Sequence, residues 1–572
     1  MRVTISVSYL RHIIRSLQVW NTEQAAAPLP DILLPRRFAR HINATVQTHY
    51  VAHQLPSMSF SALRALHASI GNAIDDLERI YADRSQSEPL HFPHLEDPYY
   101  TSATHSDEES LAHQLDDDPA VSLASKKIVA ACGQLSATVN KPWYGLMEAI
   151  QAGQLSAAIR FLEAAHIPEI LREAGPQGLH VRDIHRAVAE LRPQGSPPDP
   201  AIFTPARLGH VLRLLATSHW LQEVAPDVFA NNRRSSYIDT GKTVEQLRAE
   251  PSKKYLDTDG VAAFVGLTGD EAFKFMAYMT EWFLPDTRTG SLIVDAKGGF
   301  DHAQAAESSV KDEGAAVPYI TPFNLAFDTK LGYFPWLELP ENRARLERFG
   351  HAMTGTRQWE TKEGVLFGFP WADLPPDSVL VDVGGGIGST SLTVAQAHPH
   401  VRVVVEDRPQ VVEIAPASWG PKYAPLFESG RMSFRARDLF APWEPLASGK
   451  APDVFLLRLV LHDWQDEDSK KMLGLLRSAA GPNTKLLIGD MLLPYACDDD
   501  GAFVGEDSPI LPNLGVANIH GYLIDIMMMG MFGAKERTVS EMSELALSAG
   551  WKVTDIRRSP GSVWAYTTAI PV

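Results

Sequence analysis

A run of glycines in the last third of the chain has the composition of a loop that binds a cofactor. An apolar run over 379–383 leads directly into four glycines, which are Gly384, Gly385, Gly386 and Gly388. Glycines permit a tight turn and let another molecule approach the backbone closely, and the helix expected after them offers free N–H groups. Glu406 and Asp407 end the next apolar run, where a ribose is held in doubly wound folds. The pattern predicts a nucleotide-type cofactor site; the competing interpretation is a purely structural turn.

An acid just before the glycines indicates which kind of cofactor fits. The dinucleotide-binding fingerprint is G-x-G-x-x-G, whereas Gly384, Gly386 and Gly388 give G-x-G-x-G. Asp382 precedes this loop by two residues and suits a cofactor that carries an amino group or a positive charge rather than a diphosphate. S-adenosylmethionine has an ammonium, a sulfonium and a ribose, and we expect it to be the cofactor. No metal site is predicted.

A histidine lies at the corresponding place after a later apolar run. His462 follows the run over 453–460, so in a parallel sheet it lies at the same edge as the glycine loop. Methyl transfer to oxygen needs an acceptor hydroxyl that is aligned with the sulfur–methyl bond and loses its proton. A phenol with a pKa near 10 is acidic enough for an imidazole to assist. His462 is therefore the predicted general base; the competing role is capping or packing.

Two acids are candidates to stabilise the imidazolium that forms on His462. Asp490 ends the run KLLIGD, and Glu536 lies in GAKERT. We predict His462, Asp490 and Glu536 as the catalytic set. Asp463 and Trp464, which follow the histidine, are expected to shape the loop rather than to take part in the chemistry.

The elements that hold these residues alternate between apolar runs and helical segments. The apolar runs are SVLVDVGGG, VRVVVED, DVFLLRLV and KLLIGDMLL. Apolar strands that alternate with helices are typical of a parallel sheet covered on both faces. The predicted fold class is therefore α/β, with a C-terminal Rossmann-like domain and a mainly α-helical N-terminal half that contains a winged-helix-like dimerisation domain.

The N-terminal half shows helices, an acidic stretch and a winged-helix order. FSALRALHASIGNAIDDLERIYA predicts a helix, and the Pro-interrupted stretch over 84–120 predicts an exposed linker whose run Asp116–Asp118 is solvated. Three helices followed by a hairpin with NN as a turn indicate a winged-helix-like unit. The expected domains are an N-terminal extension over 1–120, the winged-helix-like domain over 121–250, a helical substrate-lining region over 251–360 and the catalytic domain over 361–572.

The stretch 379–566 resembles the small-molecule O-methyltransferases of the plant caffeate and isoflavone type and their fungal secondary-metabolism relatives. The matching segments are VDVGGGIGS, VVEDRPQVV, ARDLF, LRLVLHDWQDE, LLIGDMLLP and GAKERT. The resemblance implies a class I enzyme that depends on S-adenosylmethionine. The cofactor contacts that it implies are Gly384 and its neighbours at the amino-acid end, Asp407 at the ribose, Asp438 and Leu439 at the adenine, and Arg458 where the family usually has a lysine.

The resemblance also implies how the acceptor is held. Acids flank the histidine at both matching positions in the family. Met528, Met353 and Phe349 match positions that clamp an aromatic acceptor, and core packing is the competing role for each. The winged-helix-like part resembles the family's dimerisation region, so a homodimer is expected.

The overall composition limits the remaining function classes. The 572 residues carry 52 Lys+Arg against 69 Asp+Glu, a formal net charge of -17, and this acidity disfavours nucleic acid as the main partner. No apolar run reaches the roughly 18 residues of a membrane span. Only Cys132 and Cys497 occur, which favours a reducing compartment and hence the cytoplasm. The first 20 residues have a weakly organelle-targeting composition, with a surface helix as the alternative.

Three function classes are compatible with these patterns. The first is an O-methyltransferase that acts on a phenolic or enolic hydroxyl of a hydrophobic, polyketide-like secondary metabolite. The second keeps the fold and the cofactor but catalyses dehydration or pericyclic cyclisation without methyl transfer. The third is a non-enzymatic, DNA-associated regulator, and the acidic charge argues against it. The arginines that such a regulator would offer to DNA are Arg207, Arg213, Arg233 and Arg234.

Overall fold

The computed structural model describes eleven ranges of the chain. They are residues 60–85, 89–100, 107–192, 199–285, 320–360, 364–416, 419, 423–446, 449–499, 501–505 and 507–572. The chain divides between Ala62 and Leu63 into two units, and nearly everything described belongs to the second. The predicted character of the first 20 residues lies outside the described residues. Among the described helices, none has the length and apolar content needed to cross a membrane.

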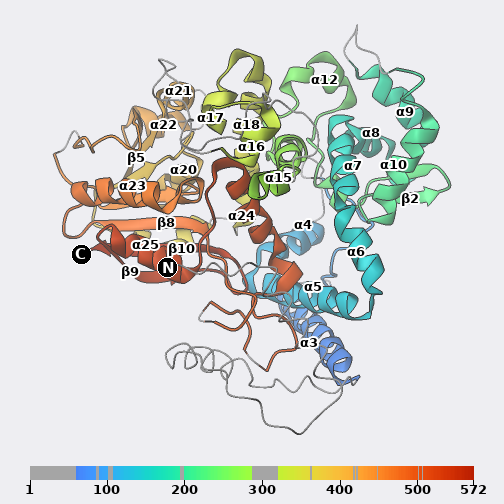
Figure 1. The fold of residues 1–572 in the computed structure, drawn as a ribbon, viewed down its shortest axis with the longest axis horizontal. Coiled ribbons are helices and arrows are strands. Elements are labelled where there is room, and N and C mark those ends of the chain that lie inside the picture. The colour runs from blue at the N-terminus through green and yellow to red at the C-terminus, as the bar shows by residue number, and fades with distance from the viewer. Residues whose placement is uncertain are drawn as a thin grey trace, which may run out of the picture. The chain divides into compact units, whose positions relative to one another are not determined.

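A seven-stranded sheet forms the centre of the C-terminal part (Figure 1). Its strands are β4 (Ser378–Val383), β5 (Val401–Asp407), β6 (Met432–Ala436), β7 (Val454–Arg458), β8 (Lys485–Met491), β9 (Trp551–Arg557) and β10 (Trp564–Pro571). The order across the sheet is β6-β5-β4-β7-β8-β10-β9, parallel from β6 to β8 and antiparallel at β10. Each of the four apolar runs is one of these strands, which confirms the predicted Rossmann-like domain.

Helices cover both faces of this sheet. On β7, Val454 and Leu456 belong to one buried cluster, whereas Phe455 and Leu457 belong to another. Successive side chains of a strand point to opposite faces, so both faces are buried and the strand has a continuous apolar sequence. The helices of this part are α19 (Gly364–Gly368), α20 (Ser389–Ala397), α21 (Pro409–Ile414), α22 (Ala424–Glu428), α23 (Asp466–Ala479) and α25 (Val539–Ser548).

The chain enters the sheet in its middle, and the strand order reverses between β4 and β7. It runs from β4 outward to β5 and β6 and then returns to β7, which lies beside β4. In open α/β sheets, ligands bind at the carboxyl ends of the strands where the strand order reverses. The loop after β4 holds the glycines and the loop after β7 holds His462. Both predicted features therefore flank this point of reversal.

Helices and a small antiparallel sheet form the region up to residue 250. The helices are α7 (Ala152–Ala164), α8 (Ile167–Ala174), α9 (Val181–Glu190), α10 (Pro205–Thr217) and α12 (Val244–Ala249), and the strands, in the order β1-β3-β2, are β1 (Leu179–His180), β2 (Gln222–Ala225) and β3 (Val228–Ala230). Thr204 caps α10 by accepting a hydrogen bond from the N–H of Arg207 at 3.3 Å. The predicted turn at NN is wrong, because the chain turns at 226–227 and Asn232 instead caps α11 (Arg233–Ser236).

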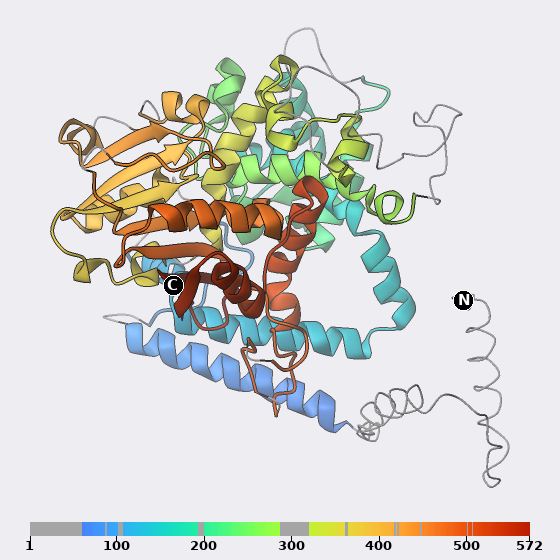
Figure 2. The same cartoon turned by 60° about the vertical axis from the view of Figure 1, so that its left-hand side comes forward.

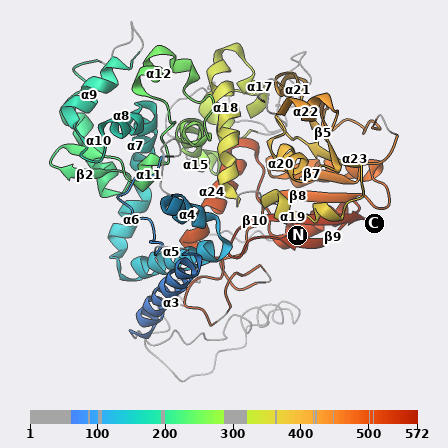
Figure 3. The same ribbon diagram turned by 180° about the vertical axis from the view of Figure 1, so that it is seen from behind.

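Short helices lie between this region and the large sheet (Figures 1 and 3). They are α13 (Val261–Leu267), the π-helical turn η3 (Thr268–Ala272), α14 (Phe273–Met276), α15 (Met279–Phe283), α16 (Pro322–Phe327), α17 (Tyr333–Leu337) and α18 (Arg343–Gly355). Helix α24 (Ile519–Phe532) reaches them from the catalytic part. A Cβ on Gly530 would meet the terminal methyl group of Met276 and lie 3.0 Å from the ring of Phe275, so α24 approaches α14 closely at this glycine. The helical N-terminal half is therefore confirmed.

The first helices that the structure describes are α3 (Ser61–Arg84), α4 (Asp107–Gln114), α5 (Pro119–Val139) and α6 (Pro142–Ile150). Of these, α3 and α5 pack against the catalytic part, and α3 runs beside α5 (Figure 2). Leu66 of α3, Ala131 of α5 and Leu514, which precedes the turn η11 (Gly515–Asn518), share one buried cluster. The Nζ of Lys126 donates to the carbonyl oxygen of Gly561 at 2.9 Å. This packing couples the N-terminal helices to the sheet domain.

The acidic stretch before α5 is more ordered than the sequence suggests. Asp116 forms an ion pair with Arg233. Asp118 caps α5 by accepting a hydrogen bond from the N–H of Ala120 at 2.9 Å. Asp116 and Asp117 are exposed, as expected for a solvated run, and Asp116 and Asp118 also have structural partners.

Candidate functional site

The glycine loop turns sharply between β4 and α20. Gly384, Gly386 and Gly388 have φ angles of 72°, 59° and 80°, in the left-handed region that favours glycine. The N–H groups of Gly384 and Gly385 donate to the carbonyl oxygen of Glu406 at 2.7 and 3.1 Å, which ties the turn to β5. A Cβ on Gly386 would meet nothing within 4 Å. One side of the loop is therefore open to another molecule.

Two carboxylates lie against this loop. Asp382 is 2% exposed, and its Oδ2 accepts a hydrogen bond from the hydroxyl of Ser391 at 2.6 Å. Burial, assisted by the negative charge of Asp407, raises the pKa of Asp382 to about 6. Asp407 ends β5, and its Oδ2 accepts a hydrogen bond from the N–H of Gly386 at 2.8 Å. The structure thus brings Asp382, Asp407 and the glycines together.

The next strand of the sheet carries Asp438 and Leu439 to the same edge. Both follow β6, which pairs in parallel with β5 up to Asp407. Asp438 is exposed and accepts a hydrogen bond from the N–H of Phe440 at 2.9 Å, and Leu439 is half-buried. Glu406, by contrast, is fully buried and pairs with Arg435. Of the two acids that end β5, only Asp407 bonds the glycine loop through its side chain.

The residues around the loop fit S-adenosylmethionine better than a diphosphate. Asp382 and Asp407 put negative charge at the loop, which repels phosphate groups and attracts an ammonium. Each oxygen of Asp407 accepts one backbone N–H, from Gly386 or from Arg408. A carboxylate has about four acceptor positions, so Asp407 retains capacity for ribose hydroxyls.

His462 lies in the short turn η10 (Leu461–Asp463) between β7 and α23. The residue is 6% exposed. Its Nδ1 is 2.6 Å from Oε1 of Glu536, and its Nε2 is 3.5 Å from Oδ1 of Asp463. Donation of the Nδ1 hydrogen to Glu536 assigns the tautomer in which Nε2 accepts a proton. The imidazole is thus oriented by Glu536 and has one nitrogen available for acid–base chemistry.

Asp490 lies near His462 but has a different hydrogen-bond partner. It is 2% exposed, and its Oδ1 accepts a hydrogen bond from the N–H of Leu459 at 3.1 Å. Its Oδ2 is buried and lacks a hydrogen-bond partner within the described part of the chain. Asp490 therefore acts on the imidazole through its charge, while Glu536 makes the direct hydrogen bond.

Buried carboxyl groups control the charge of His462. Burial alone lowers the pKa of His462, but Glu536, Asp463 and Asp490 together outweigh burial and raise the pKa to about 10. Burial raises the pKa of Asp490 to about 7 and that of Asp463 to about 6, while the attraction of His462 opposes both shifts. The titrations of His462, Asp463 and Asp490 therefore depend on one another. Protonation of a carboxyl group, or a further positive charge nearby, favours the neutral imidazole.

Arg537 positions the base loop and was missed by the sequence analysis. Its side chain is 1% exposed and donates to the carbonyl oxygens of Leu461 at 2.9 Å and Trp464 at 3.0 Å. These two carbonyl groups flank His462 and Asp463. The only indication in the sequence is that Arg537 directly follows Glu536 in GAKERT. Asp463, expected only to shape the loop, also lies close to the base.

Trp419 is a second residue that the sequence analysis missed. Its indole N–H donates to the carbonyl oxygen of Ile387 in the glycine loop at 2.8 Å. Its ring lies 5.5 Å from that of Tyr423, in an edge-to-face arrangement. Trp419 therefore adds an aromatic side chain to the glycine loop. No sequence motif around Trp419 predicts this contact.

The three predicted acceptor residues have different surroundings. Phe349 of α18 contacts the rings of Tyr333 and Phe334, with centroid distances of 5.9 and 5.7 Å. Met528 of α24 is 5% exposed and belongs to the buried cluster on which Phe349 packs. Met353, one turn after Phe349, is 36% exposed. The structure therefore joins Phe349 and Met528 in one apolar region and leaves Met353 at its surface.

Arg458 is directed toward an acid that the sequence analysis did not consider. It is the last residue of β7, and its Nε and Nη2 donate to Oε1 of Glu360 at 2.9 and 2.6 Å. Its charge also lowers the pKa of Asp382, in opposition to burial. Arg458 thus lies near the cofactor loop while its described hydrogen bonds go to Glu360.

Comparison with known proteins identifies relatives over most of the chain. The O-methyltransferase domain family matches residues 348–552. An O-methyltransferase of Armillaria gallica is 34% identical over 505 residues, which cover 87% of this chain and 95% of the relative. The 4-O-methyltransferase 1 of Phanerochaete chrysosporium is 33% identical over 509 residues, covering 87% and 96%. A solved structure described as a pericyclic reaction enzyme is 16% identical with a TM-score of 0.58, covering 88% of this chain and 100% of that chain.

Proposed function

This chain belongs to the S-adenosylmethionine-dependent O-methyltransferases, and on that premise we propose which residues carry the reaction and what they act on. The acceptor is a phenolic or enolic hydroxyl of a hydrophobic, polyketide-like secondary metabolite, and His462 is the general base. The observation that carries the proposal is the 2.6 Å contact between His462 Nδ1 and Glu536 Oε1, in the loop that follows the strand beside the glycine loop.

The cofactor is held by the carboxyl ends of three adjacent strands. Gly384, Gly385 and Gly386 with Asp382 take the amino-acid end, Asp407 takes the ribose, and Asp438 with Leu439 takes the adenine. When bound, S-adenosylmethionine supplies an activated methyl group on a positively charged sulfur. The acids at this edge provide the negative charge that such a cofactor needs, and the open space beside Gly386 gives it access to the backbone.

The base works in three steps that the geometry of the loop permits. Glu536 accepts the Nδ1 hydrogen and fixes the ring, so that Nε2 faces the acceptor hydroxyl. Nε2 would take the proton of the acceptor hydroxyl, while S-adenosylmethionine, when bound, would supply the methyl group and leave as S-adenosylhomocysteine. The resulting imidazolium is stabilised by Glu536 and by the charge of Asp490. A positively charged cofactor bound at the glycine loop would lower the pKa of His462, which would favour the neutral base that the reaction requires.

The apolar region between α18 and α24 holds the body of the acceptor. Phe349 and Met528 line this region, and Met353 closes it from the exposed side. Phe532 of α24 stacks on Phe334 at 5.3 Å and meets Tyr333 at 5.9 Å. Aromatic rings packed in this way recognise a flat apolar ligand, which is why we propose an aromatic metabolite.

The protein acts as a homodimer. Helix α6, all of which the structure describes, contains no buried residue. Its apolar side chains Trp143, Tyr144, Leu146 and Ile150 are between 51% and 63% exposed, and such a patch marks an interface. Light scattering should give twice the chain mass of 63.0 kDa. Leu146→Glu should shift the mass toward one chain, whereas Leu547→Glu, at an exposed leucine of α25, should not; equal masses for both variants would contradict an interface at α6.

The alternative functions are not favoured. The relatives that align over most of the chain are named O-methyltransferases, whereas similarity to a pericyclic enzyme at low identity shows the fold alone. The arginines proposed for DNA have other partners, since Arg213 bonds Glu223 and Asp227 and Arg233 bonds Asp116.

The two cysteines are free and exposed, as a reducing cytoplasm allows.

A methyl-transfer assay with matched acceptors tests the proposal. Purified protein is incubated with S-adenosylmethionine labelled on the methyl group and a panel of hydroxylated naphthalenes and anthraquinones. Each acceptor is paired with its methyl ether at the same position. We expect label in the product of at least one free phenol and none in its ether. Label in the ether, or a rearranged product without label, would contradict O-methylation as the reaction.

A further inference from the structure

A buried ion pair joins the acceptor region to the strand that carries the base. Arg458 and Glu360 are both 10% exposed at their side chains, and Oε1 of Glu360 accepts hydrogen bonds from Nε and Nη2 of Arg458 at 2.9 and 2.6 Å. Their sequence separation is 98 residues. Glu360 directly follows the turn η6 (Thr356–Trp359), which continues from α18. The pair therefore connects the helix of Phe349 to the end of β7.

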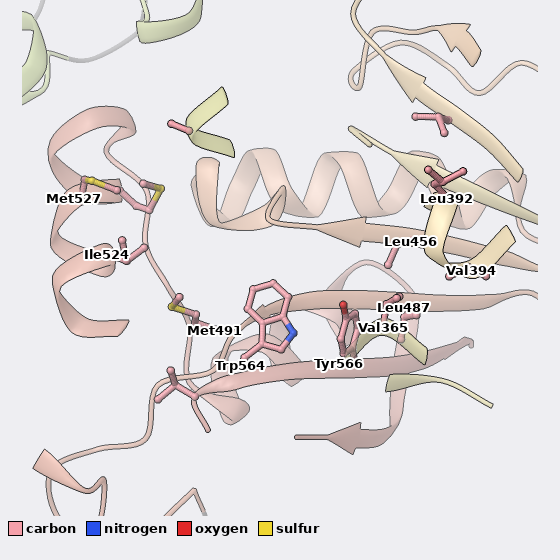
Figure 4. Close-up of a cluster of buried hydrophobic side chains, with 14 of the residues drawn as sticks. Val365, Leu392, Val394, Leu456, Leu487, Met491, Ile524, Met527, Trp564 and Tyr566 are labelled. Atoms are coloured by element: carbon pink, nitrogen blue, oxygen red, sulfur yellow. The ribbon is translucent and has the colours of Figure 1, made fainter. Parts of the chain in front are cut away.

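Two aromatic side chains of β10 complete the environment of this pair. The hydroxyl of Tyr566 donates to Oε2 of Glu360 at 2.7 Å, and the guanidinium of Arg458 lies over the ring of Trp564 at 4.8 Å from its centroid. Trp564 and Tyr566 are two residues apart on the strand and project from the same face (Figure 4). A Cβ on Gly489 would lie 2.8 Å from the Tyr566 ring. Glycine at position 489 of β8 therefore leaves room for the Tyr566 ring.

Both carboxylate oxygens of Glu360 accept hydrogen bonds. Oε1 of Glu360 receives two N–H groups and Oε2 receives one O–H. Burial lowers the pKa of Arg458, but the attraction of Glu360 outweighs it, so the pKa lies above its usual range. A buried pair with this geometry is rigid, and loss of one partner leaves the other charge uncompensated.

The backbone next to Arg458 leads directly to the base. Leu459 adopts a positive φ of 54°, which is uncommon for a residue with a branched side chain. Its N–H donates to the carbonyl oxygen of Gly489 at 3.0 Å and to Oδ1 of Asp490 at 3.1 Å. His462 follows three residues later. The conformation at the end of β7 therefore sets both the position of Asp490 and the start of the base loop.

We propose that Arg458 and Glu360 are positioning residues for the base, and that Arg458 does not bind the cofactor. Their ion pair fixes the end of β7, so that Leu459 holds Asp490 and η10 presents His462 to the acceptor. Because Glu360 continues from α18, the same pair keeps the acceptor region in register with the base. This inference rests on the proposed O-methyltransferase reaction and deepens it.

Substitution of either partner separates positioning from cofactor binding. Glu360→Gln and Arg458→Lys should each lower kcat about 10- to 100-fold, because small displacements of a reacting group have effects of this size. The affinity for S-adenosylhomocysteine, measured by calorimetry, should stay within about threefold in both. The double variant should lose no more than the worse single variant, because both act through one pair. A tenfold loss of affinity in Arg458→Lys with no loss in Glu360→Gln would instead make Arg458 a cofactor contact.

Two further measurements keep the test decisive. Tyr566→Phe removes one hydrogen bond to Glu360 and leaves no charge unpaired. It should lower kcat severalfold while its melting temperature stays close to that of the wild type. This variant therefore tests the proposal even if Glu360→Gln folds poorly. The pH at which His462 titrates, followed by NMR of isotope-labelled histidine, should shift in Glu360→Gln, whereas a merely structural role leaves it unchanged. The titration needs no methyl transfer, so an inactive wild type would refute the proposed function alone, and an unshifted titration would refute the positioning role alone.

Discussion

Replacement of Glu536 by glutamine removes the charge that holds the proton on His462. The side chain keeps its size and an oxygen that can accept the Nδ1 hydrogen, so the change is mainly electrostatic. Glu536 is the strongest of the groups that raise the pKa of His462 from 6.5 to about 10. We therefore expect Glu536→Gln to lower that pKa and to weaken the base.

The size of the effect follows from the pKa of His462. At 1.36 kcal/mol per pKa unit, the shift to about 10 is a preference of about 5 kcal/mol for the imidazolium. Glu536 is the largest of the contributions that raise this pKa, so the pKa in the variant falls. A base that is weaker and less well oriented should lower the maximal rate by about 100-fold, within the range for general base catalysis.

The pH dependence of kcat/KM is the measurement for this prediction. It reports ionisations of the free enzyme, and the rate needs neutral His462, so the rate rises with pH through the pKa of that residue. The rise should move toward lower pH in Glu536→Gln. The same acceptor is used for both proteins, so its own ionisation cancels in the comparison. Glu544→Gln, at an exposed glutamate of α25, should leave the profile unchanged.

One outcome would refute this reasoning about the base. If Glu536→Gln keeps its rate within about threefold of wild type and its pH profile is not displaced, Glu536 does not control the protonation of His462. The short contact between the two side chains would then be a structural hydrogen bond.

Three further predictions concern the base loop and the cofactor edge. Arg537→Met should lower the free energy of unfolding by about 3–5 kcal/mol, because it leaves buried carbonyl groups without their donor. Arg343→Met, at an 82% exposed side chain, should change the free energy of unfolding by less than about 0.5 kcal/mol. Urea unfolding measures both values, and equal values would contradict the anchoring role of Arg537. Gly386→Ala and Gly430→Ala both place a Cβ at positive φ in open space and should each cost about 1 kcal/mol in melting experiments. Only Gly386→Ala should weaken S-adenosylhomocysteine binding, by about tenfold or more, and a similar loss in Gly430→Ala would exclude a specific role of the loop. Asp382 has a pKa of about 6, and its carboxylate must be ionised to hold an ammonium. The affinity for S-adenosylhomocysteine should therefore fall as the pH is lowered through 6, and it should be nearly independent of pH in Asp382→Asn. A wild-type affinity that is equal at pH 7 and pH 5 would contradict this contact.

Features set by local sequence were predictable, and the glycine loop shows why. An apolar strand, a run of glycines and a helix are encoded within about 20 consecutive residues, and the parallel order of the strands brings their carboxyl ends to one edge. The sequence pattern therefore predicted that Asp382, Asp407 and His462 lie near one another.

Partners that are distant in sequence were not predictable from one chain. Arg458 was expected to contact the cofactor because it lies where the resembling family usually has a lysine. Its hydrogen bonds instead go to Glu360, which lies in a segment with no recognisable motif. The sequence around Arg537 does not show whether its side chain is a buried anchor or an exposed charge. The ion pair of Asp116 was not predictable because its partner Arg233 is 117 residues away. Tertiary packing decided each case.

The most direct test of the central claim is the rate of one methyl transfer with and without the imidazole. Enzyme loaded with labelled S-adenosylmethionine is mixed with an accepted phenol, and the labelled product is followed over a single turnover in wild type and in His462→Ala. We expect a loss of at least about 100-fold in this rate, with affinity for S-adenosylhomocysteine unchanged within about threefold. A His462→Ala variant that transfers the methyl group at the wild-type rate would show that another group removes the proton.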